Sequence, residues 1–338
     1  MKKTRIVFFE TDEKWREDGF RKELPSSKFD LIFTNSKLNS GTAKRFKNVE
    51  IAVVFIRSKI DAKVFSLLPR LKLVATNSTG FDHIDLGEAK KSGVKVCTVP
   101  FYGENTVAEH TFAMILAISR KIVRSVNRTR RGKFVLDGLR GFDLKGKTIG
   151  VVGTGHIGQH VIRIAHGFEM KILAYSIKKD RTLESKYPLQ YVNLEKLLKN
   201  SDIVTLHAPY KKETHHMINR QNIKKFKPGS LLINTARGGL VETSALLWAL
   251  QKRILAGAGL DVLEEEGIIT EDKAMISGYH ERKDLAVVLA DHKLMSLDNV
   301  IVTPHNAFNS DESVRRIIET TITNIKAWKK GSPVNLVN

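Results

Sequence analysis

Short runs of β-branched residues alternate with helical patterns from one end of this chain to the other. Such alternation predicts βαβ units, and therefore an α/β fold built on parallel sheets. A first series of candidate strands covers Arg5–Phe9, Leu31–Thr34, Ile51–Ile56, Leu71–Thr76 and Lys95–Val99. A second series covers Thr148–Gly153, Lys171–Tyr175, Ile203–His207, Leu231–Thr235, Gly257–Val262 and Val300–Thr303. The six strands of the second series suit a complete dinucleotide-binding sheet.

The first strand of the second series runs directly into the glycine motif Gly153-Thr-Gly155-His156-Ile157-Gly158, after which the apolar pattern becomes helical. In a strand-to-helix turn, the first glycine permits the tight turn and the second lets backbone N–H groups approach a pyrophosphate. The third glycine lets helix and strand pack closely, and the helix dipole favours phosphate. We therefore expect a dinucleotide site here, rather than glycines that only mark a turn.

The next strand ends in Tyr175 and Ser176, where an acid that binds the ribose hydroxyls is expected. Without that carboxylate, a 2′-phosphate is not repelled, and the nearby Lys178 and Lys179 could attract one. Alternatively, Ser176 bonds a hydroxyl of NAD and the lysines are simply solvated. These residues alone therefore do not decide whether the cofactor is NAD or NADP.

Three later segments each follow a predicted strand and carry polar chemistry. They contain Arg237, then Asp261 with Glu266, then His305. Because each follows a parallel strand, all three should gather at the carboxyl edge of one sheet, where ligands bind in such folds. An arginine, a carboxylate and a histidine provide an anion clamp, an orienting base and a proton donor.

Composition limits the other functions. The chain has 338 residues, enough for about two domains, and 56 Lys and Arg against 36 Asp and Glu give a net charge of +20. That charge suits an anionic partner, but no DNA-reading motif accompanies it, so nucleic acid is not expected. The single cysteine, Cys97, favours the reducing cytoplasm. The longest apolar run, Phe112 to Ile118, is too short to span a bilayer.

Two further segments have helical periodicity. One starts near Asn105 and carries apolar residues from Phe112 to Val126, which we expect to be buried at a domain or dimer interface. The other, from Asp311 to Trp328, has acids near its start and should return to the first domain. No metal site is expected, because the adjacent His215 and His216 have no cysteine or paired acid beside them.

The chain resembles the D-isomer-specific 2-hydroxyacid dehydrogenases over essentially its whole length, and most closely their D-lactate dehydrogenase branch. The motifs that carry the resemblance are Thr79 to Asp85, Val107 to His110, Gly153 to Gly158, Leu206 to Pro209, Asn234 to Gly238, Leu260 to Glu266 and Pro304-His305. The resemblance implies a flavodoxin-like substrate domain from residues 1–100 and 306–338, with a Rossmann domain of residues 101–305 inserted into it. It also implies a homodimer formed through the helical region 105–130.

The resemblance also assigns residues to roles. Arg237 matches the substrate-binding arginine, His305 the catalytic acid/base, and Glu266 the acid partner of that histidine. The predicted substrate-binding residues are Ser78, Thr79, Gly80, Tyr102 and Phe308. The predicted cofactor-binding residues are Gly153, Gly155, His156, Ile157, Gly158, Tyr175, Ser176, His207, Ala208, Pro209, Thr214, Thr235, Ala236 and Asp261. Asn77 departs from the family, where relatives often carry Arg, and Glu264 and Glu265 are expected to be solvent-exposed neighbours of Glu266.

The activity implied is the reversible reduction of a small 2-keto acid to a D-2-hydroxy acid, with NAD(H) as the expected cofactor and NADP(H) as the alternative. Pyruvate reduction to D-lactate is the favoured reaction, because Tyr102 and Phe308 suggest a small apolar pocket. Hydroxypyruvate or glyoxylate reduction is the alternative within the family. A non-catalytic, corepressor-like regulator is the alternative from another class. Formate dehydrogenases have Gln in place of the acid partner, so Glu266 argues against them.

Overall fold

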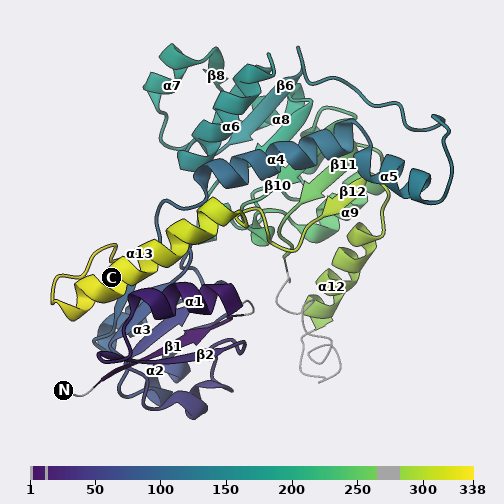
Figure 1. The fold of residues 1–338 in the computed structure, drawn as a ribbon. Coiled ribbons are helices and arrows are strands. Elements are labelled where there is room, and N and C mark those ends of the chain that lie inside the picture. The colour runs from purple at the N-terminus through teal and green to yellow at the C-terminus, as the bar shows by residue number, and fades with distance from the viewer. Residues whose placement is uncertain (1–2, 12–13, 265–281) are drawn as a thin grey trace. The chain divides into compact units, whose positions relative to one another are not determined.

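The computed structural model describes residues 3–11, 14–264 and 282–338 (Figure 1). The chain divides into two compact units. Unit 1 comprises Met1–Tyr102 and Ser310–Asn338, and unit 2 comprises Gly103–Asn309. Each unit is built on its own parallel sheet, so the predicted α/β fold class is confirmed.

The sheet of unit 1 has the strand order β2-β1-β3-β4-β5, the flavodoxin-like order. Its strands are β1 (Thr4–Phe9), β2 (Phe29–Thr34), β3 (Ile51–Val54), β4 (Leu73–Thr76) and β5 (Lys95–Cys97). Its helices are α1 (Lys14–Glu23), the short η1 (Ala43–Phe46), α2 (Ala62–Leu67), α3 (Leu86–Lys91) and α13 (Asp311–Lys329). All five strands correspond to the first predicted series.

Alternation along β1 shows why this sheet is covered on both faces. Ile6 and Phe8 belong to a core that includes residues of α1 and α13, while Val7 and Phe9 belong to a core that includes residues of α2 and α3. Successive side chains of a strand point to opposite faces, so the continuous apolar run from Ile6 to Phe9 needs helices on both faces. The final helix α13, capped by Ser310, supplies Ile322 and Ile325 to the first of these cores.

The sheet of unit 2 has the order β12-β11-β10-β9-β6-β7-β8, which contains the Rossmann arrangement with one added edge strand. Its strands are β6 (Thr148–Val152), β7 (Lys171–Tyr175), β8 (Leu189–Tyr191), β9 (Ile203–Leu206), β10 (Ser230–Asn234), β11 (Leu255–Leu260) and β12 (Val300–Val302). Every pairing between neighbours is parallel. The carboxyl ends of all seven strands therefore lie along one edge.

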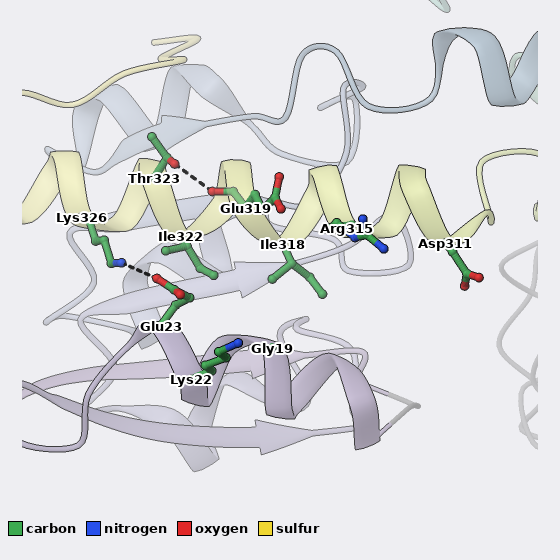
Figure 2. A pocket seen from close by; sticks show the side chains of 10 residues that line it. All are labelled: Gly19, Lys22, Glu23, Asp311, Arg315, Ile318, Glu319, Ile322, Thr323 and Lys326. Atoms are coloured by element: carbon green, nitrogen blue, oxygen red, sulfur yellow. Dashed lines mark hydrogen bonds and ion pairs between the residues drawn. The ribbon is translucent and has the colours of Figure 1, made fainter.

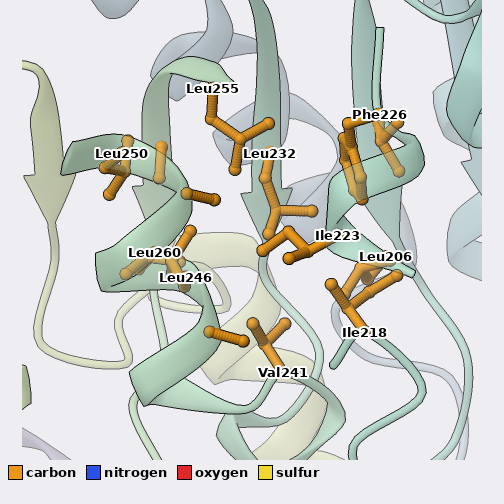
Figure 3. Close-up of a cluster of buried hydrophobic side chains, with 14 of the residues drawn as sticks. Leu206, Ile218, Ile223, Phe226, Leu232, Val241, Leu246, Leu250, Leu255 and Leu260 are labelled. Carbon is orange, nitrogen blue, oxygen red and sulfur yellow. The ribbon is translucent and has the colours of Figure 1, made fainter. Parts of the chain in front are cut away.

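Helices cover both faces of this second sheet. One core cluster includes residues of α8 (Leu194–Asn200), α9 (Thr243–Gln251) and α12 (Arg282–Met295), and Figure 3 shows its apolar side chains meeting around Leu232 and Leu260. The opposite cluster includes residues of α4 (Glu104–Ser119), α6 (His156–Gly167) and α7 (Arg181–Lys186). Short helices η2 (Lys212–Thr214), η3 (Ile223–Lys225) and η4 (Gly238–Leu240) lie in the connecting loops.

Two sequence-based expectations need correction in unit 2. Strand β8 was not predicted, because Leu189 and Tyr191 are only partly buried, Gln190 is exposed, and the three residues give no strong apolar run. The predicted helix from Asn105 to Val126 is broken, because Lys121 adopts a left-handed conformation (φ 53°) between α4 and α5 (Ile122–Arg130). Phe112 is buried in the core, but Val126 on α5 is exposed. The apolar stripe is therefore buried only in its first half.

Candidate functional site

The glycine turn between β6 and α6 is the best-defined part of the site. Gly153 has a φ of +95°, and its N–H donates a hydrogen bond to Tyr175 O at 2.8 Å. A Cβ at Gly153 would lie 2.7 Å from the backbone of His207 and Ala208. Backbone cannot yield as a flexible side chain can, so this position requires glycine. The turn therefore brings the carboxyl ends of β6, β7 and β9 together.

The other two glycines of the motif have different surroundings. A Cβ at Gly158 would lie 2.1 Å from Gly153 O, so this glycine is needed for close packing of α6 on the turn. A Cβ at Gly155 would meet nothing within 4 Å, and no side chain caps the helix there. The first N–H groups of α6, which include those of His156 and Ile157, therefore have no side-chain cap. This open N-terminus fits the pyrophosphate of a dinucleotide.

Tyr191, on the unpredicted strand β8, shapes the next part of the cofactor edge. Its hydroxyl donates to Thr154 Oγ1 at 3.0 Å and accepts from the Asp180 N–H at 3.1 Å. It therefore ties the glycine turn to the loop that begins at Ser176. Sequence reasoning missed this residue; the signal available was its position downstream of β7, which is where a third strand of a mononucleotide-binding half belongs.

His207 follows β9 and is held in a neutral form. Its Nε2 lies 2.9 Å from Thr205 Oγ1, and its Nδ1 is buried without a hydrogen-bond partner. Burial lowers the pKa of His207 to about 3, because the charged imidazolium would lose its hydration. The loop continues through Ala208 and Pro209, where the Thr214 hydroxyl donates to Pro209 O at 2.8 Å. Thr214 thus fixes the loop shape.

The loop after β10 presents Arg237. Asn234 organises it, because its side-chain Nδ2 donates to Arg237 O at 2.9 Å and its Oδ1 accepts from the Ala236 N–H at 3.1 Å. The buried Thr235 hydroxyl lies 3.0 Å from that of Thr111. Arg237 itself donates from Nη1 to Ala236 O at 2.9 Å. The guanidinium is therefore carried on a loop with a defined backbone.

Asp261, at the end of β11, organises the loop after β12. Its carboxylate accepts from the Thr303 hydroxyl at 2.6 Å and from the N–H groups of Asn306 at 3.0 Å and Ala307 at 2.9 Å. His110 Nε2 lies 3.6 Å from the same carboxylate. Asp261 is 1% exposed, so this buried charge is stabilised by the loop it binds. Its predicted role in binding the cofactor stays a prediction.

His305 lies within the loop that Asp261 holds. Its φ is +53°, a left-handed conformation that is unusual for a non-glycine residue. Its backbone N–H donates to Asp261 O at 2.9 Å. Phe308, a predicted substrate-binding residue, lies three residues after His305 and belongs to the same unit. Glu266, the predicted acid partner of His305, lies outside the described residues.

Glu264 differs from the expectation that it is solvent-exposed. Its side chain is only 14% exposed, and its Oε1 lies 2.5 Å from His216 Nε2. The prediction was wrong because the residue type alone suggested an acidic surface, whereas the backbone after β11 turns this carboxylate toward the loop that carries His216. Glu265 lies outside the described residues. Among the described residues, no cluster of three or more His, Cys, Asp or Glu could hold a metal ion.

On unit 1, the predicted substrate loop follows β4. The Ser78 hydroxyl donates to Gly80 O at 2.6 Å, and the Thr79 hydroxyl donates to Val99 O at 2.8 Å. Asn77, the departure from the family pattern, accepts from the Thr321 hydroxyl at 2.7 Å. The loop is thus fixed by its own side chains and by α13.

Two more residues of unit 1 are held by hydrogen bonds: Glu10, which the sequence did not single out, and the predicted substrate residue Tyr102. Glu10, which follows β1 and is 3% exposed, accepts from the N–H groups of Phe55 and Arg57 at 3.1 and 2.9 Å. Its left-handed φ of 59° could not be read from the sequence. Further along the chain, the predicted substrate residue Tyr102 accepts at its carbonyl from Arg316 Nη1 at 2.7 Å.

Unit 1 also has a surface groove of about 720 Å³ between α1 and α13 (Figure 2). Lys326 and Glu23 form an ion pair across it at 2.9 Å, and the apolar Ile318 and Ile322 line it as well. None of the predicted site residues lines this groove. The described helices include none with both the length and the apolarity to span a membrane.

Comparison with known proteins agrees with this geometry. Residues 112–307 match the family model described as D-isomer specific 2-hydroxyacid dehydrogenase, NAD binding domain. A 2-hydroxyacid dehydrogenase homolog of Zymomonas mobilis is 34% identical over 97% of this chain and 97% of its own. Glyoxylate reductase of Pyrococcus furiosus is 36% identical over 96% of this chain and 88% of its own.

A solved structure is similar to this chain in fold as well as in sequence. D-Lactate dehydrogenase from Aquifex aeolicus, complexed with NAD and lactic acid, superimposes with a TM-score of 0.87 at 38% identity, covering 97% of this chain and 96% of that one. The open N-terminus of α6 fits NAD as cofactor. The chain belongs to the D-isomer-specific 2-hydroxyacid dehydrogenases, and it is an NAD-dependent oxidoreductase of that family.

Proposed function

We propose that this enzyme reduces pyruvate reversibly to D-lactate. The observation that carries the proposal is the placement of three groups on neighbouring strands. Arg237, Asp261 and His305 follow β10, β11 and β12, which are adjacent in the sheet of unit 2. Carboxyl ends of neighbouring parallel strands are where ligands bind in such sheets. The similarity of this chain to the D-lactate dehydrogenase of Aquifex aeolicus supports pyruvate and D-lactate as the reactants.

Arg237, His305 and Glu266 each have a distinct chemical role in the proposal. Arg237 binds the substrate carboxylate in a bidentate manner and polarises the ketone, stabilising negative charge that develops on its oxygen. His305 donates a proton to that oxygen during reduction and accepts it in the reverse direction. Glu266 pairs with His305 and favours its charged form. When bound, the reduced nicotinamide supplies hydride to the carbonyl carbon.

The cofactor edge is proposed to distinguish weakly between NAD and NADP. Gly153 to Gly158 bind the pyrophosphate, and Tyr175, Ser176 and the loop from His207 line the adenosine and nicotinamide ends. Lys178 and Lys179 are exposed beside Ser176, where an acid would otherwise repel a 2′-phosphate. NADP use is therefore a secondary activity in this proposal.

The substrate pocket is proposed to be small and apolar. Ser78, Thr79 and Gly80 hold the substrate carboxylate with backbone groups, and Tyr102 and Phe308 limit the side chain. A second candidate is glyoxylate or hydroxypyruvate reduction, which the glyoxylate reductase of Pyrococcus furiosus favours. An apolar pocket separates substrates that differ by one methylene by only about 1–3 kcal/mol. The three keto acids must therefore be compared in the same assay. Membership of an enzyme family argues against the corepressor-like alternative.

The enzyme is also proposed to be a homodimer that functions in the cytoplasm. Ile122, Val126, Phe134 and Leu136 are exposed along α5 and the segment after it, and exposed apolar patches of this kind mark protein interfaces. The Cys97 thiol is free and buried, which suits a reducing compartment. Sedimentation of the wild type and of Phe134→Glu/Leu136→Glu tests the interface; a wild-type monomer would contradict it.

The function is tested with a panel of 2-keto acids, each assayed with NADH and with NADPH. We expect pyruvate to give the highest kcat/KM with NADH, and glyoxylate and hydroxypyruvate to follow. A preference for glyoxylate or hydroxypyruvate would replace the proposed substrate by the second candidate. Failure of every keto acid to oxidise either cofactor would overturn the proposed reaction.

A further inference from the structure

His216 and Glu264 form a close pair whose two residues belong to none of the predicted roles. Glu264 Oε1 lies 2.5 Å from His216 Nε2, and the two side chains are 14% and 30% exposed. The ring of His215 stacks on that of His216 with centroids 3.7 Å apart. A partly buried hydrogen bond to a carboxylate is stronger than one in water. The contact therefore joins two loops firmly.

The pair also anchors the loop that follows Arg237. The second oxygen of Glu264 accepts from the Thr243 N–H at 3.1 Å. The His216 N–H donates to Gly239 O at 2.8 Å, and the Ile218 N–H donates to Leu240 O at 3.0 Å. Residues 239–243 are therefore held by hydrogen bonds from the backbone of the His216 loop and by a hydrogen bond to the Glu264 carboxylate.

Close packing at Gly238 connects this arrangement to Arg237. A Cβ at Gly238 would lie 2.0 Å from Leu263 O, so the two backbones touch directly. Leu263 immediately precedes Glu264, and Gly238 immediately follows Arg237. A displacement of the backbone at Glu264 is therefore transmitted to Arg237 without passing through a flexible side chain.

We propose that Glu264 and His216 are positioning residues that hold Arg237 in register for the substrate carboxylate. This inference rests on the proposed function of Arg237. Neither residue contacts substrate or cofactor in the proposal; both act through the backbone of residues 237–243. Positional errors of about 1 Å cost up to 10²-fold in rate, so a firm anchor has a kinetic consequence.

The kinetic test compares Glu264→Ala, Glu264→Gln and His216→Gln with Glu213→Ala, an exposed acid on the His216 loop. We expect Glu264→Ala to raise the KM for pyruvate about tenfold or more while the KM for NADH stays unchanged. Glutamine at 264 can still accept from Thr243 and contact His216, so it should recover most of the loss. Glu213→Ala should match the wild type. An unchanged pyruvate KM in both Glu264→Ala and His216→Gln would overturn the positioning role.

A second measurement does not depend on turnover. Hydrogen exchange of the peptide that contains residues 237–243 should accelerate in Glu264→Ala and stay at the wild-type rate in Glu213→Ala, because Thr243 loses its acceptor. Unchanged exchange would contradict the anchor even if activity fell. If the wild type reduces no 2-keto acid but exchange accelerates as expected, the loop anchor stands and the proposed function fails. If Glu264→Ala does not fold, His216→Gln provides both readouts.

Discussion

Asp261 and Thr303 lie 42 positions apart in sequence, and the Thr303 hydroxyl donates to the Asp261 carboxylate at 2.6 Å. The same carboxylate accepts the Asn306 and Ala307 N–H groups, so one buried charge fixes the loop on which His305 lies. In this enzyme the geometry of the proposed acid/base is therefore set by a residue on the neighbouring strand.

Replacing Asp261 tests this relationship. Asp261→Ala leaves one hydroxyl and two N–H groups without their acceptor, and each unsatisfied buried group costs about 1–3 kcal/mol. We expect the free energy of unfolding to fall by roughly 3 kcal/mol or more, and kcat to fall with it. Asp261→Asn keeps one acceptor oxygen and should lose less. Wild-type stability in the alanine variant, measured by urea unfolding, would contradict the account.

The glycine turn offers a matched pair of substitutions. Gly153→Ala places a Cβ 2.7 Å from the backbone at His207 and forces an unfavourable φ, so it should destabilise the fold. Gly155→Ala meets nothing within 4 Å and should leave the melting temperature nearly unchanged. Its methyl group instead stands where the pyrophosphate must approach, so NADH affinity, followed by fluorescence titration, should fall. Equal NADH affinity in Gly155→Ala and wild type would argue against pyrophosphate binding at this turn.

His207 makes the stability of the enzyme depend on pH. Its pKa is about 3 in the folded state, against an ordinary value of 6.5 for a histidine in the unfolded chain. The unfolded chain therefore binds the proton first as pH falls, so stability is unaffected above about pH 6.5 and declines below it. At pH 5 the loss is roughly 2 kcal/mol, from 1.36 kcal/mol per pKa unit.

The measurement is urea unfolding without cofactor at pH 7.5 and at pH 5, for wild type, His207→Asn and His215→Asn. The asparagine at 207 has no such proton to bind, so its stability should change less between the two pH values. His215 is exposed and serves as the control. The same pH dependence in His207→Asn and wild type would show that His207 is not the group responsible.

The proposal makes the choice between NAD and NADP depend on Ser176, the residue after Tyr175. Ser176→Asp introduces the carboxylate that binds ribose hydroxyls and repels a 2′-phosphate. We expect the KM for NADPH to rise about tenfold, equivalent to ~1.4 kcal/mol, while the KM for NADH stays the same or falls. Lys178→Ala/Lys179→Ala should weaken NADPH in the same direction by removing positive charge. Steady-state kinetics with both cofactors checks this, and equal effects on NADH and NADPH would contradict it.

The sequence predicted the elements with strong local signals. The apolar β-branched runs are strands in both units, and the switch from strand to helical periodicity around Gly153 marks the turn correctly. Strand β8 was missed because Leu189–Tyr191 is short and only partly buried. The helix break at Lys121 was missed because nothing in an Arg-Lys pair indicates a left-handed backbone.

Arg237, Asp261 and His305 follow adjacent strands of the unit 2 sheet, but the sequence did not show how their loops are held. The roles of Asp261 and Glu264 come from hydrogen bonds to backbone N–H groups more than twenty positions away, or to a histidine 48 positions away. Such partners depend on tertiary packing and leave no local pattern. Glu10 was missed for the same reason, whereas Tyr191 was missed because the short strand β8 that carries it was not predicted.

The most direct measurement is the rate of pyruvate-dependent NADH oxidation by wild type and His305→Gln, with NADH binding followed in parallel. Proton donation from a positioned group contributes about 10²–10⁴-fold, so we expect kcat to fall by that factor in His305→Gln while the Kd for NADH is unchanged. D-Lactate should be the product of the wild-type reaction. A kcat equal to wild type in His305→Gln, or L-lactate as the product, would contradict the account.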